Sequence, residues 1–523
     1  MNKNQNSSRK RLFTWAWQGC LMLGAAGLLL TSCADDGFAD ESFVSGDGVT
    51  NTQLTSPSAD NITITATTDK AYTLISWKVV YGAGGYDCKV YDVTDEEPVV
   101  LVDSIIDNTT FSVKREEDRN YIFAIKTLGN TKLGNTDALD ATQVKFNSFL
   151  EAFQSISTGT DLYTYFKENP IPTEDVEGEI CYDLEAGGSY TISGPLDFGG
   201  SYVVLRSTDK NNRPTITYTT GTETGTDDEG NETTTNTVGS INTSAPMTLQ
   251  NLKFDCSQVP DETKNIAAIY LSATPDESIK AKTGGGSYYN IMDGAIYITN
   301  CDFEGVKGMF LYDNNKAYCV ENLLISNSRV HFTVPSQQAN LAYIYTPGGF
   351  VKDVTIKNST FWNTGAGDLQ YVIRYNNSGR LDRAGYDRNS QTQSVNLLNS
   401  TFYHVGYGWF ANYNGFAGQV YTNFDIENNI FVDAGKGGSG VARRLLGGRA
   451  ATSYGKCVFQ YNTYWTNGAP EAEGAPGQEG PSYDLSGTAL QTDPALVNPD
   501  NGDLTPTGSE QVEHKTGDPF WFE

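Results

Sequence analysis

One short pattern, written six times between Met247 and Phe431, most limits the folds open to this 523-residue chain. Each copy reads apolar, any, apolar, any, Asn, and an apolar or aromatic residue follows three positions later. The copies are Met247–Asn251, Ile296–Asn300, Leu323–Asn327, Val354–Asn358, Val395–Asn399 and Phe424–Asn428, and a seventh, Cys457–Tyr461, has Tyr in place of Asn. Apolar residues at period two that end at a polar residue predict a short strand, buried on one face, that runs into a bend.

The spacing of the copies predicts a solenoid. From Asn300 to Tyr461 the ends of successive copies lie roughly 27 to 41 residues apart, which is one coil with a loop of variable length. Asn tolerates the left-handed conformation of a bend, and its amide can bond to an Asn stacked in the next coil. We therefore predict an all-β fold whose main part is a parallel β-helix with a column of stacked asparagines.

The first residues predict export and a lipid anchor. Basic residues precede the apolar run Leu21–Leu30, which is too short to remain as a membrane span. The next residues complete Leu30-Thr-Ser-Cys33, which resembles a bacterial lipobox with Cys33 as the acylated residue. The acidic residues that follow resemble a tag for the outer face of the outer membrane, and a generic acidic linker is the alternative. We expect a signal peptide at 1–33, a flexible linker at 34–53 and a surface-exposed, lipid-anchored protein.

The composition favours a sugar ligand over a nucleic acid. A formal net charge of -27 and a pI of about 4.4 argue against a nucleic-acid partner. Aromatic residues make up 12% of the chain and offer rings on which sugars stack. The cysteines and histidines are scattered without metal-site spacing, so we predict neither a resident metal nor a cofactor.

The chain divides into two predicted domains. Residues 54–146 alternate like a β-sandwich and resemble a fibronectin type III module, with Trp77 in the core, Tyr86 on the third strand and Tyr121 at a tyrosine corner. Residues 147–523 would form the β-helix, whose open N-terminal end a short amphipathic helix would cover.

Three further segments of the second domain carry local predictions. Thr219–Ser240 and Ala469–Gly480 lack an apolar period and are predicted to be exposed loops. The tail Asp493–Trp521 is predicted to close the solenoid by packing its aromatic pair on the last coil.

A second strand-like run follows most of the Asn residues and predicts a ligand-binding wall. The runs begin roughly 10 to 15 residues after each Asn, so the solenoid should stack them. This would align Tyr312, Asp313, Tyr345, Arg374, Tyr375, Trp409, Tyr413, Arg443 and Arg444. Rings can stack on sugar faces and guanidinium groups pair with carboxylate or sulfate, so the wall would suit an extended acidic polysaccharide.

Two alternatives apply to these residues. Any single aromatic residue is equally well explained by packing between coils. The basic residues gathered nearby, which include Arg380, Arg383, Arg388, Lys436 and Arg449, favour an acidic ligand. However, Arg374 and Arg443 could instead pair with Asp382, Asp387 or Asp433 on a solvated face.

Taken together, these features resemble a family of surface lipoproteins of unknown function from the glycan-utilisation loci of gut bacteria. The resemblance is carried by Leu30–Cys33, by Trp77 and Tyr121, by the Asn column and by the ending Asp493–Trp521. It implies a lipobox, a fibronectin type III module and a pectin-lyase-like, right-handed parallel β-helix. It further implies a protein that binds or presents a uronic-acid-containing, pectin-like polysaccharide, with other glycan-utilisation proteins as possible partners.

The alternative function is a polysaccharide lyase that cleaves uronic-acid polymers by β-elimination. Arg374 or Arg443 would then remove the proton beside the uronate carboxylate, and Ca²⁺ near Asp313 or Asp353 would neutralise that carboxylate. The sequence contains no compact acidic cluster at ligand spacing, nor the paired Asp residues of a polygalacturonase-like hydrolase. This favours binding over catalysis.

Overall fold

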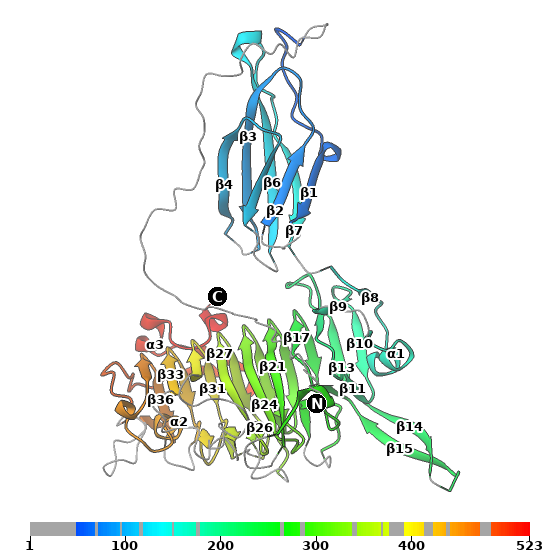
Figure 1. Cartoon of the computed structure of the whole chain (residues 1–523). Helices are drawn as coiled ribbons and strands as arrows, with labels where there is room; N and C mark the ends of the chain where they lie inside the picture. Colours follow the sequence, from blue (N-terminus) through cyan, green and yellow to red (C-terminus); the bar gives the residue numbers. More distant parts are fainter. Residues whose placement is uncertain are drawn as a thin grey trace, which may run out of the picture. The chain divides into compact units, whose positions relative to one another are not determined.

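The computed structural model describes residues 49–522 except 68–71, 95–96, 115–118, 149–150, 174–177, 228, 262–265, 283–287, 337–341, 368–369, 376–391, 413–421, 436–439 and 471–482. The predicted signal peptide, Cys33 and most of the linker lie outside these residues. The chain forms two compact units, Met1–Ser148 and Phe149–Glu523, which we describe separately (Figure 1). No helix within the described residues is long and apolar enough to cross a membrane.

The first unit consists of two antiparallel sheets around one hydrophobic core. One sheet contains β1 (Ile62–Ala66), β2 (Tyr72–Trp77) and β5 (Thr110–Lys114), and the other contains β4 (Val99–Ile106), β3 (Ala83–Asp92), β6 (Asn120–Gly129) and β7 (Thr142–Asn147). Trp77, Tyr86 and Tyr121 are all buried in the core that the two sheets share. The Tyr86 hydroxyl accepts a hydrogen bond from the Val80 backbone at 2.8 Å, so this ring also fixes the loop before its own strand.

The second unit is a parallel β-helix made of three sheets, as the repeat pattern predicts. Sheet 1 contains β8 (Gln154–Ile156), β9 (Ile180–Leu184), β12 (Val203–Arg206), β17 (Met247–Gln250), β21 (Tyr288–Thr299), β24 (Tyr318–Ser326), β27 (Phe350–Lys357), β30 (Gln393–Leu398), β33 (Thr422–Glu427) and β35 (Lys456–Gln460), and β20 (Lys280–Lys282) pairs antiparallel with β21. Strands of successive coils are adjacent in this sheet, so each coil adds one strand to it (Figure 1).

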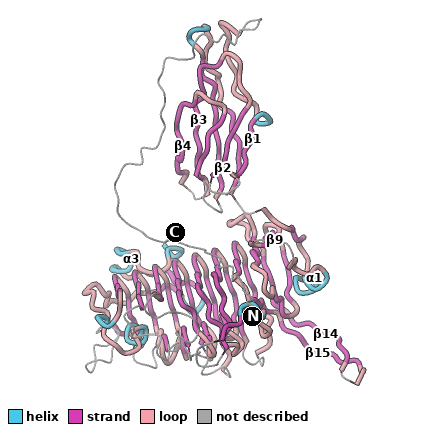
Figure 2. Tube along the Cα trace, viewed as in Figure 1, coloured by secondary structure: helices cyan, strands magenta, loops and turns pink. Residues whose placement is uncertain are grey.

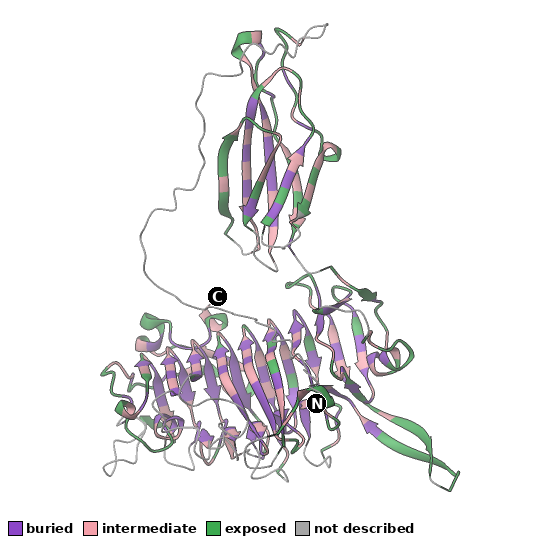
Figure 3. Cartoon of the chain, in the orientation of Figure 1, coloured by how far each residue is buried: buried purple, intermediate pink, exposed green. Residues whose placement is uncertain are grey.

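Sheets 2 and 3 continue each coil. Sheet 2 contains β10 (Ser189–Ile192), β13 (Thr215–Tyr218), β18 (Lys253–Asp255), β22 (Asp302–Val306), β25 (Arg329–Phe332), β28 (Thr360–Asn363), β31 (Thr401–Tyr403), β34 (Ile430–Val432), β36 (Thr463–Thr466) and the antiparallel β37 (Ala469–Pro470). Sheet 3 contains β11 (Pro195–Asp197), β16 (Ser240–Thr243), β19 (Ala267–Leu271), β23 (Met309–Tyr312), β26 (Ala342–Thr346), β29 (Tyr371–Tyr375) and β32 (Ala411–Asn412). Inward-facing side chains from all three sheets form one continuous core (Figure 3).

The predicted asparagine column is confirmed. The six Asn residues at the bend between sheets 1 and 2 all have positive φ, from 46° at Asn399 to 57° at Asn251. Asn300 donates from its amide to Asn251 at 2.8 Å, and Asn358 donates to Asn327 at 3.1 Å. Tyr461 adopts the same conformation with φ 49°, so the seventh copy makes the same bend.

A second column, which the sequence analysis missed, runs beside the first. It consists of the residues that directly follow the bend in five successive coils: Ser328, Ser359, Ser400, Asn429 and Asn462. Each side chain after Ser328 accepts a hydrogen bond from the backbone N–H of the preceding member, at 3.0 to 3.2 Å, and Ser328 accepts from the Cys301 N–H at 3.1 Å. All five are fully buried, so these bonds satisfy backbone groups that water does not reach.

A short helix covers the core at the N-terminal end of the solenoid. In α1 (Leu162–Glu168), the Asp161 side chain caps the first turn by accepting from the Thr164 backbone at 2.9 Å. Leu162 and Phe166 are buried, and the Phe166 ring lies 4.8 Å from that of Tyr182 in the first full coil. This agrees with the capping helix expected from the sequence.

The C-terminal tail contacts the last coil through Gln511, which donates to Thr463 at 3.1 Å, and through His514, whose ring stacks on Tyr461 at 4.3 Å. Its aromatic pair does not pack there, so that part of the prediction is wrong. After β38 (Leu496–Asn498), β39 (Asp503–Pro506) and α3 (Ser509–His514), the chain ends in a 3₁₀ turn, Pro519–Phe522. There the Trp521 indole donates to Thr360 of β28 at 2.8 Å, and Phe520 lies 3.7 Å from the guanidinium of Arg329 in β25. The tail therefore runs back along the outside of sheet 2, where Trp521 packs in an apolar cluster with Trp362 and Tyr403.

The segment Thr219–Ser240 is not a loop but mainly a β-hairpin. Its strands β14 (Thr220–Thr226) and β15 (Glu232–Val238) extend away from the coils (Figure 2). The prediction of a loop is wrong because it assumes that every strand has an apolar face. Threonine favours strands even where both faces of the strand meet water. The other predicted loop, Ala469–Gly480, begins with β37, and most of it lies outside the described residues.

Candidate functional site

The strand register of sheet 3 brings three of the predicted residues together on its outer face. Tyr312 of β23 pairs with Tyr345 of β26, and Tyr345 pairs with Arg374 of β29. The same position in the preceding coil is Tyr270 of β19, which the sequence analysis missed. Its run, Ala267–Leu271, follows Asn251 as the other runs follow their own Asn residues, so the repeat could have revealed it.

These side chains form a row in which the Tyr312 and Tyr345 rings stack face to face, whereas Tyr270 meets Tyr312 edge-on. The Tyr270 and Tyr312 ring centroids are 6.0 Å apart, and the Tyr312 and Tyr345 rings stack at 5.7 Å. The Arg374 guanidinium then lies 5.4 Å from the Tyr345 ring. Tyr312 is buried, and its hydroxyl accepts a hydrogen bond from Asn315 at 2.6 Å, so a ligand would mainly meet the Tyr270 and Tyr345 side chains and the Arg374 guanidinium. The row thus offers fewer open ring faces for sugars than the sequence predicts.

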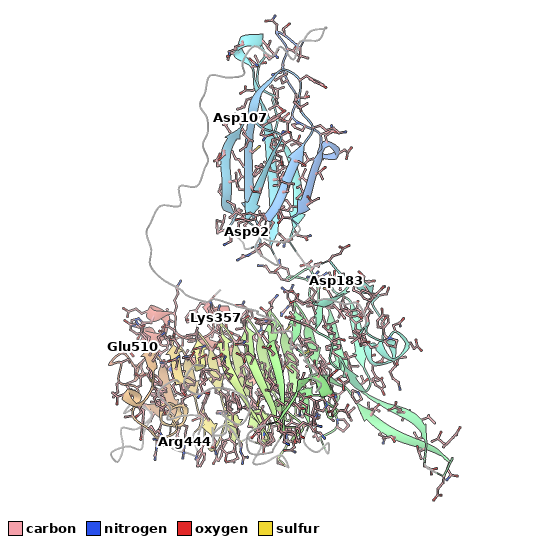
Figure 4. All side chains as sticks on the ribbon, viewed as in Figure 1. Asp92, Asp107, Asp183, Lys357, Arg444 and Glu510 are labelled. Atoms are coloured by element: carbon pink, nitrogen blue, oxygen red, sulfur yellow. The ribbon has the colours of Figure 1, made fainter. Side chains whose placement is uncertain are left out.

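The row continues into the next coil through two further aromatic rings and a second arginine. The Arg374 guanidinium lies 4.6 Å from the Tyr371 ring, whose centroid is 5.8 Å from that of Trp409. The Arg444 guanidinium covers Trp409 at 3.6 Å. Figure 4 labels Arg444 in the C-terminal part of the β-helix. We call the whole set the aromatic–arginine row: Tyr270, Tyr312, Tyr345, Arg374, Tyr371, Trp409 and Arg444.

Arg443 and Arg444 lie on a helix, which corrects the prediction that they belong to one of the strand-like runs. In α2 (Val441–Leu445), the buried side chains Val441, Ala442 and Leu445 face the core. Val441 lies one position before Ala442 and four before Leu445, a spacing that places all three on one face of a helical turn. The prediction of a strand from so few residues is therefore wrong. The two guanidinium-bearing residues are therefore consecutive on a helix and half-buried.

Positive charge is concentrated at this end of the row. Burial lowers the pKa of Arg444, and the neighbouring charge of Arg443 lowers it further. Because both effects disfavour the protonated guanidinium, a bound anion would stabilise it. The arrangement is therefore suited to a carboxylate or sulfate group.

Asp313 and Tyr375 do not face the row, which corrects their predicted placement on the wall. Tyr375 is fully buried and points into the solenoid core, because neighbouring residues in a strand alternate between faces. Asp313 is also fully buried, and it accepts backbone hydrogen bonds from Asn315 at 2.9 Å and Gly348 at 3.3 Å. Tyr413, Arg380, Arg383, Arg388 and Lys436 lie outside the described residues.

Asp313 gives a testable pH dependence of stability. Burial raises the pKa of its carboxyl from 3.8 to about 7. The folded protein therefore binds more protons than the unfolded chain between these values, and stability present at lower pH is lost as the pH rises through about 7. We expect a loss on the order of 2–4 kcal/mol across this interval in the wild type.

The measurement is urea denaturation at a series of pH values for the wild type and for Asp313→Asn, whose side chain does not ionise. The wild type should lose more stability than the variant as the pH rises. Equal slopes for the two proteins would contradict this assignment to Asp313.

Asp313 and Asp353, which the lyase alternative places near Ca²⁺, are not arranged as ligands of one Ca²⁺ ion. Asp313 is occupied by backbone donors, as described above. Asp353 lies on β27 in sheet 1, not in the sheet of Arg374, and it accepts from Ser394 at 2.8 Å and pairs with Lys352 at 3.6 Å. In the described ranges no three His, Cys, Asp or Glu side chains gather as metal ligands would. We therefore derive no step through a metal ion.

Asp433 is the one alternative salt-bridge partner of Arg374 and Arg443 that the structure describes. Asp433 lies 3.0 Å from His404 and accepts the Asn467 backbone N–H at 2.7 Å. Asp382 and Asp387 lie outside the described residues.

Comparisons with known proteins give families without an assigned function. A domain of unknown function, DUF4992, matches residues 7–187, and another, DUF4957, matches residues 188–364. No curated protein sequence matches the chain. Among solved structures, pectate lyase Pel3 from Pectobacterium carotovorum aligns at 10% identity over 80% of this chain and 92% of that one, with a TM-score of 0.13. A TM-score this low carries no argument, so the fold rests on the strand pairing described above.

Proposed function

We propose that this protein is a cell-surface lipoprotein that binds or presents a uronic-acid-containing, pectin-like polysaccharide for a glycan-utilisation system. The observation that carries the proposal is the aromatic–arginine row, in which Arg374 and Arg444 alternate with aromatic rings. Guanidinium groups bind carboxylates bidentately, and tyrosine hydroxyls bond to sugar hydroxyls. These are the groups that an acidic polysaccharide presents.

The shape of the row supports an extended ligand over a small one. Tyr270, Tyr312, Tyr345 and Arg374 come from four successive coils. Neighbouring strands lie about 4.8 Å apart, which is close to the length of one sugar unit in a chain. A polysaccharide lying along the solenoid could thus contact each coil in turn.

The proposed location rests on the N-terminal sequence. We infer that acylation of Cys33 anchors the protein to the outer membrane and that the first unit is a fibronectin type III-like spacer. Replacement Cys33→Ala should abolish incorporation of labelled fatty acid and release the protein from the membrane fraction. Retained labelling would place the lipid elsewhere and contradict the anchor.

The binding proposal is tested with polygalacturonate and the double variant Arg374→Gln/Arg444→Gln. Removal of two charged donors should weaken binding about tenfold or more, because each charge-assisted hydrogen bond contributes about 1.5–3 kcal/mol. Affinity electrophoresis provides the measurement, with neutral, fully methyl-esterified pectin as the control ligand. Lys253→Gln is a matched control variant, because it removes an exposed cation from the outside of sheet 2.

The same experiment separates binding from β-elimination. A lyase would produce an unsaturated product whose ultraviolet absorbance grows with time. Retardation of polygalacturonate without this absorbance supports a binding protein, and growth of the absorbance supports the alternative, a polysaccharide lyase. Equal retardation of the wild type and the double variant would overturn the proposed site.

A further inference from the structure

The hairpin formed by β14 and β15 is an arm without a partner among the described strands. Its register is continuous over seven residue pairs, from Thr220↔Val238 to Thr226↔Glu232. Six of the seven residues of β14 and five of the seven of β15 are exposed, and the hairpin forms a two-stranded sheet of its own (Figure 3). A two-stranded hairpin without a hydrophobic face is only marginally stable in water.

The base of the arm is held firmly to the N-terminal end of the solenoid. Glu223 forms an ion pair of 2.6 Å with Lys167 of α1, and the same lysine lies 5.1 Å from the Tyr163 ring. Thr237 donates to the Ser193 backbone carbonyl at 2.7 Å. Asp227 orders the tip by accepting backbone N–H groups from Glu229 at 3.0 Å and Asn231 at 2.8 Å. The arm is thus attached to the solenoid and ends in an ordered turn, while most of its strand residues remain exposed.

The edges of the arm carry few of the features that normally block strand pairing. Natural sheets protect exposed edges with lysine, proline or β-bulges. Residues 219–238 contain neither lysine nor proline, and the pairing of β14 with β15 has no bulge. The backbone N–H and C=O groups along the outer edges therefore remain suitable for an added strand.

The charge of the arm indicates what kind of strand it would accept. Its charged residues are all acidic: Glu223, Asp227, Asp228, Glu229 and Glu232. Like charges placed opposite each other destabilise strand pairing, so the arm of a second copy is a poor partner. A basic strand would pair without this repulsion and would be attracted before contact.

We propose that the β14–β15 arm is a docking site for a basic, extended segment of a partner protein, which adds a strand to its free edge. The backbone ladder would supply affinity, and the acidic side chains would select the partner by charge. This inference is independent of polysaccharide binding, because the arm contains none of the residues in the aromatic–arginine row.

The test uses the whole protein and a fluorescent seven-residue peptide of alternating lysine and valine, measured by anisotropy. A second peptide has the same side chains but a methyl group on every backbone nitrogen, so it has no N–H groups for a ladder. The first peptide should bind at least about tenfold more tightly than the second, because methylation removes every backbone donor. Amide hydrogen exchange in residues 220–238 should slow when the first peptide is bound.

Two variants distinguish peptide binding to the arm from attraction to the negative charge of the whole protein. Glu229→Lys/Glu232→Lys reverses charge on the arm, and Glu97→Lys/Glu513→Lys makes the same change at exposed positions elsewhere. The arm variant should weaken binding of the lysine peptide about tenfold, while the control retains wild-type affinity within about twofold. Equal binding of the two peptides, equal effects of the two variants, or unchanged exchange in the arm would each overturn the proposal.

Discussion

Replacement Gly349→Ala should prevent the solenoid from folding. Gly349 lies directly before β27, where the chain passes close to the preceding coil. A Cβ atom at this position would overlap the backbone carbonyl oxygen of Tyr318, at the start of β24. Both partners belong to packed backbone, so neither can move away as a flexible side chain would. We expect a loss of more than about 4 kcal/mol in the free energy of unfolding.

The effect would be measured by soluble expression and by thermal unfolding followed by circular dichroism. Gly225→Ala is the matched control, because its nearest neighbour would be the Thr233 hydroxyl at 3.4 Å in the exposed hairpin. This control should change stability by no more than about 0.5 kcal/mol. Normal folding of Gly349→Ala would show that the two coils lie farther apart at this point than described.

Replacement Asp518→Ala should release the C-terminal tail from sheet 2. The Asp518 carboxylate is 2% exposed, and it accepts from the Thr360 hydroxyl at 2.7 Å and from the Phe520 backbone at 3.1 Å. Its own N–H donates to Thr401 at 3.0 Å. Alanine would remove the charged acceptor and leave a buried hydroxyl without it. Hydrogen bonds to charged groups contribute about 1.5–3 kcal/mol each, so we expect a loss of about 3 kcal/mol.

Limited proteolysis and thermal unfolding would both report this change. Cleavage after Lys515 should become faster in Asp518→Ala, together with a lower unfolding temperature. Glu513→Ala provides the control, because Glu513 is an exposed acidic residue in the same tail. If both variants unfold and are cleaved like the wild type, the Asp518 contacts do not hold the tail.

The coils were predictable because their signal is repeated. One Asn at a bend means little, but six at the same offset from the same apolar pair predict a stacked column, and the positive φ values confirm it. The outer row was partly predictable for the same reason, since strand register follows from coil spacing. Tyr312, Tyr345 and Arg374 are aligned as expected.

Features that belong to one coil or one side chain could not be predicted from the repeat. Among the described coils, the helix at Arg443 and Arg444 takes the place of a sheet 3 strand once, so the repeat gives no sign of it. Likewise, Tyr375 and Asp313 each follow a row residue by one position, and a strand turns such neighbours to the opposite face. Ring orientation was also inaccessible, because stacking between Tyr312 and Tyr345 is set by side-chain packing and not by spacing.

The buried column of Ser328, Ser359, Ser400, Asn429 and Asn462 has a direction. In it, the backbone N–H of one coil is satisfied only by a side chain supplied by the coil that comes later in the sequence. During synthesis or export, the most recently emerged coil therefore always has an unsatisfied donor at its growing end. This makes assembly vectorial: each coil is completed by its successor, and the leading part of the chain can order before the rest has arrived.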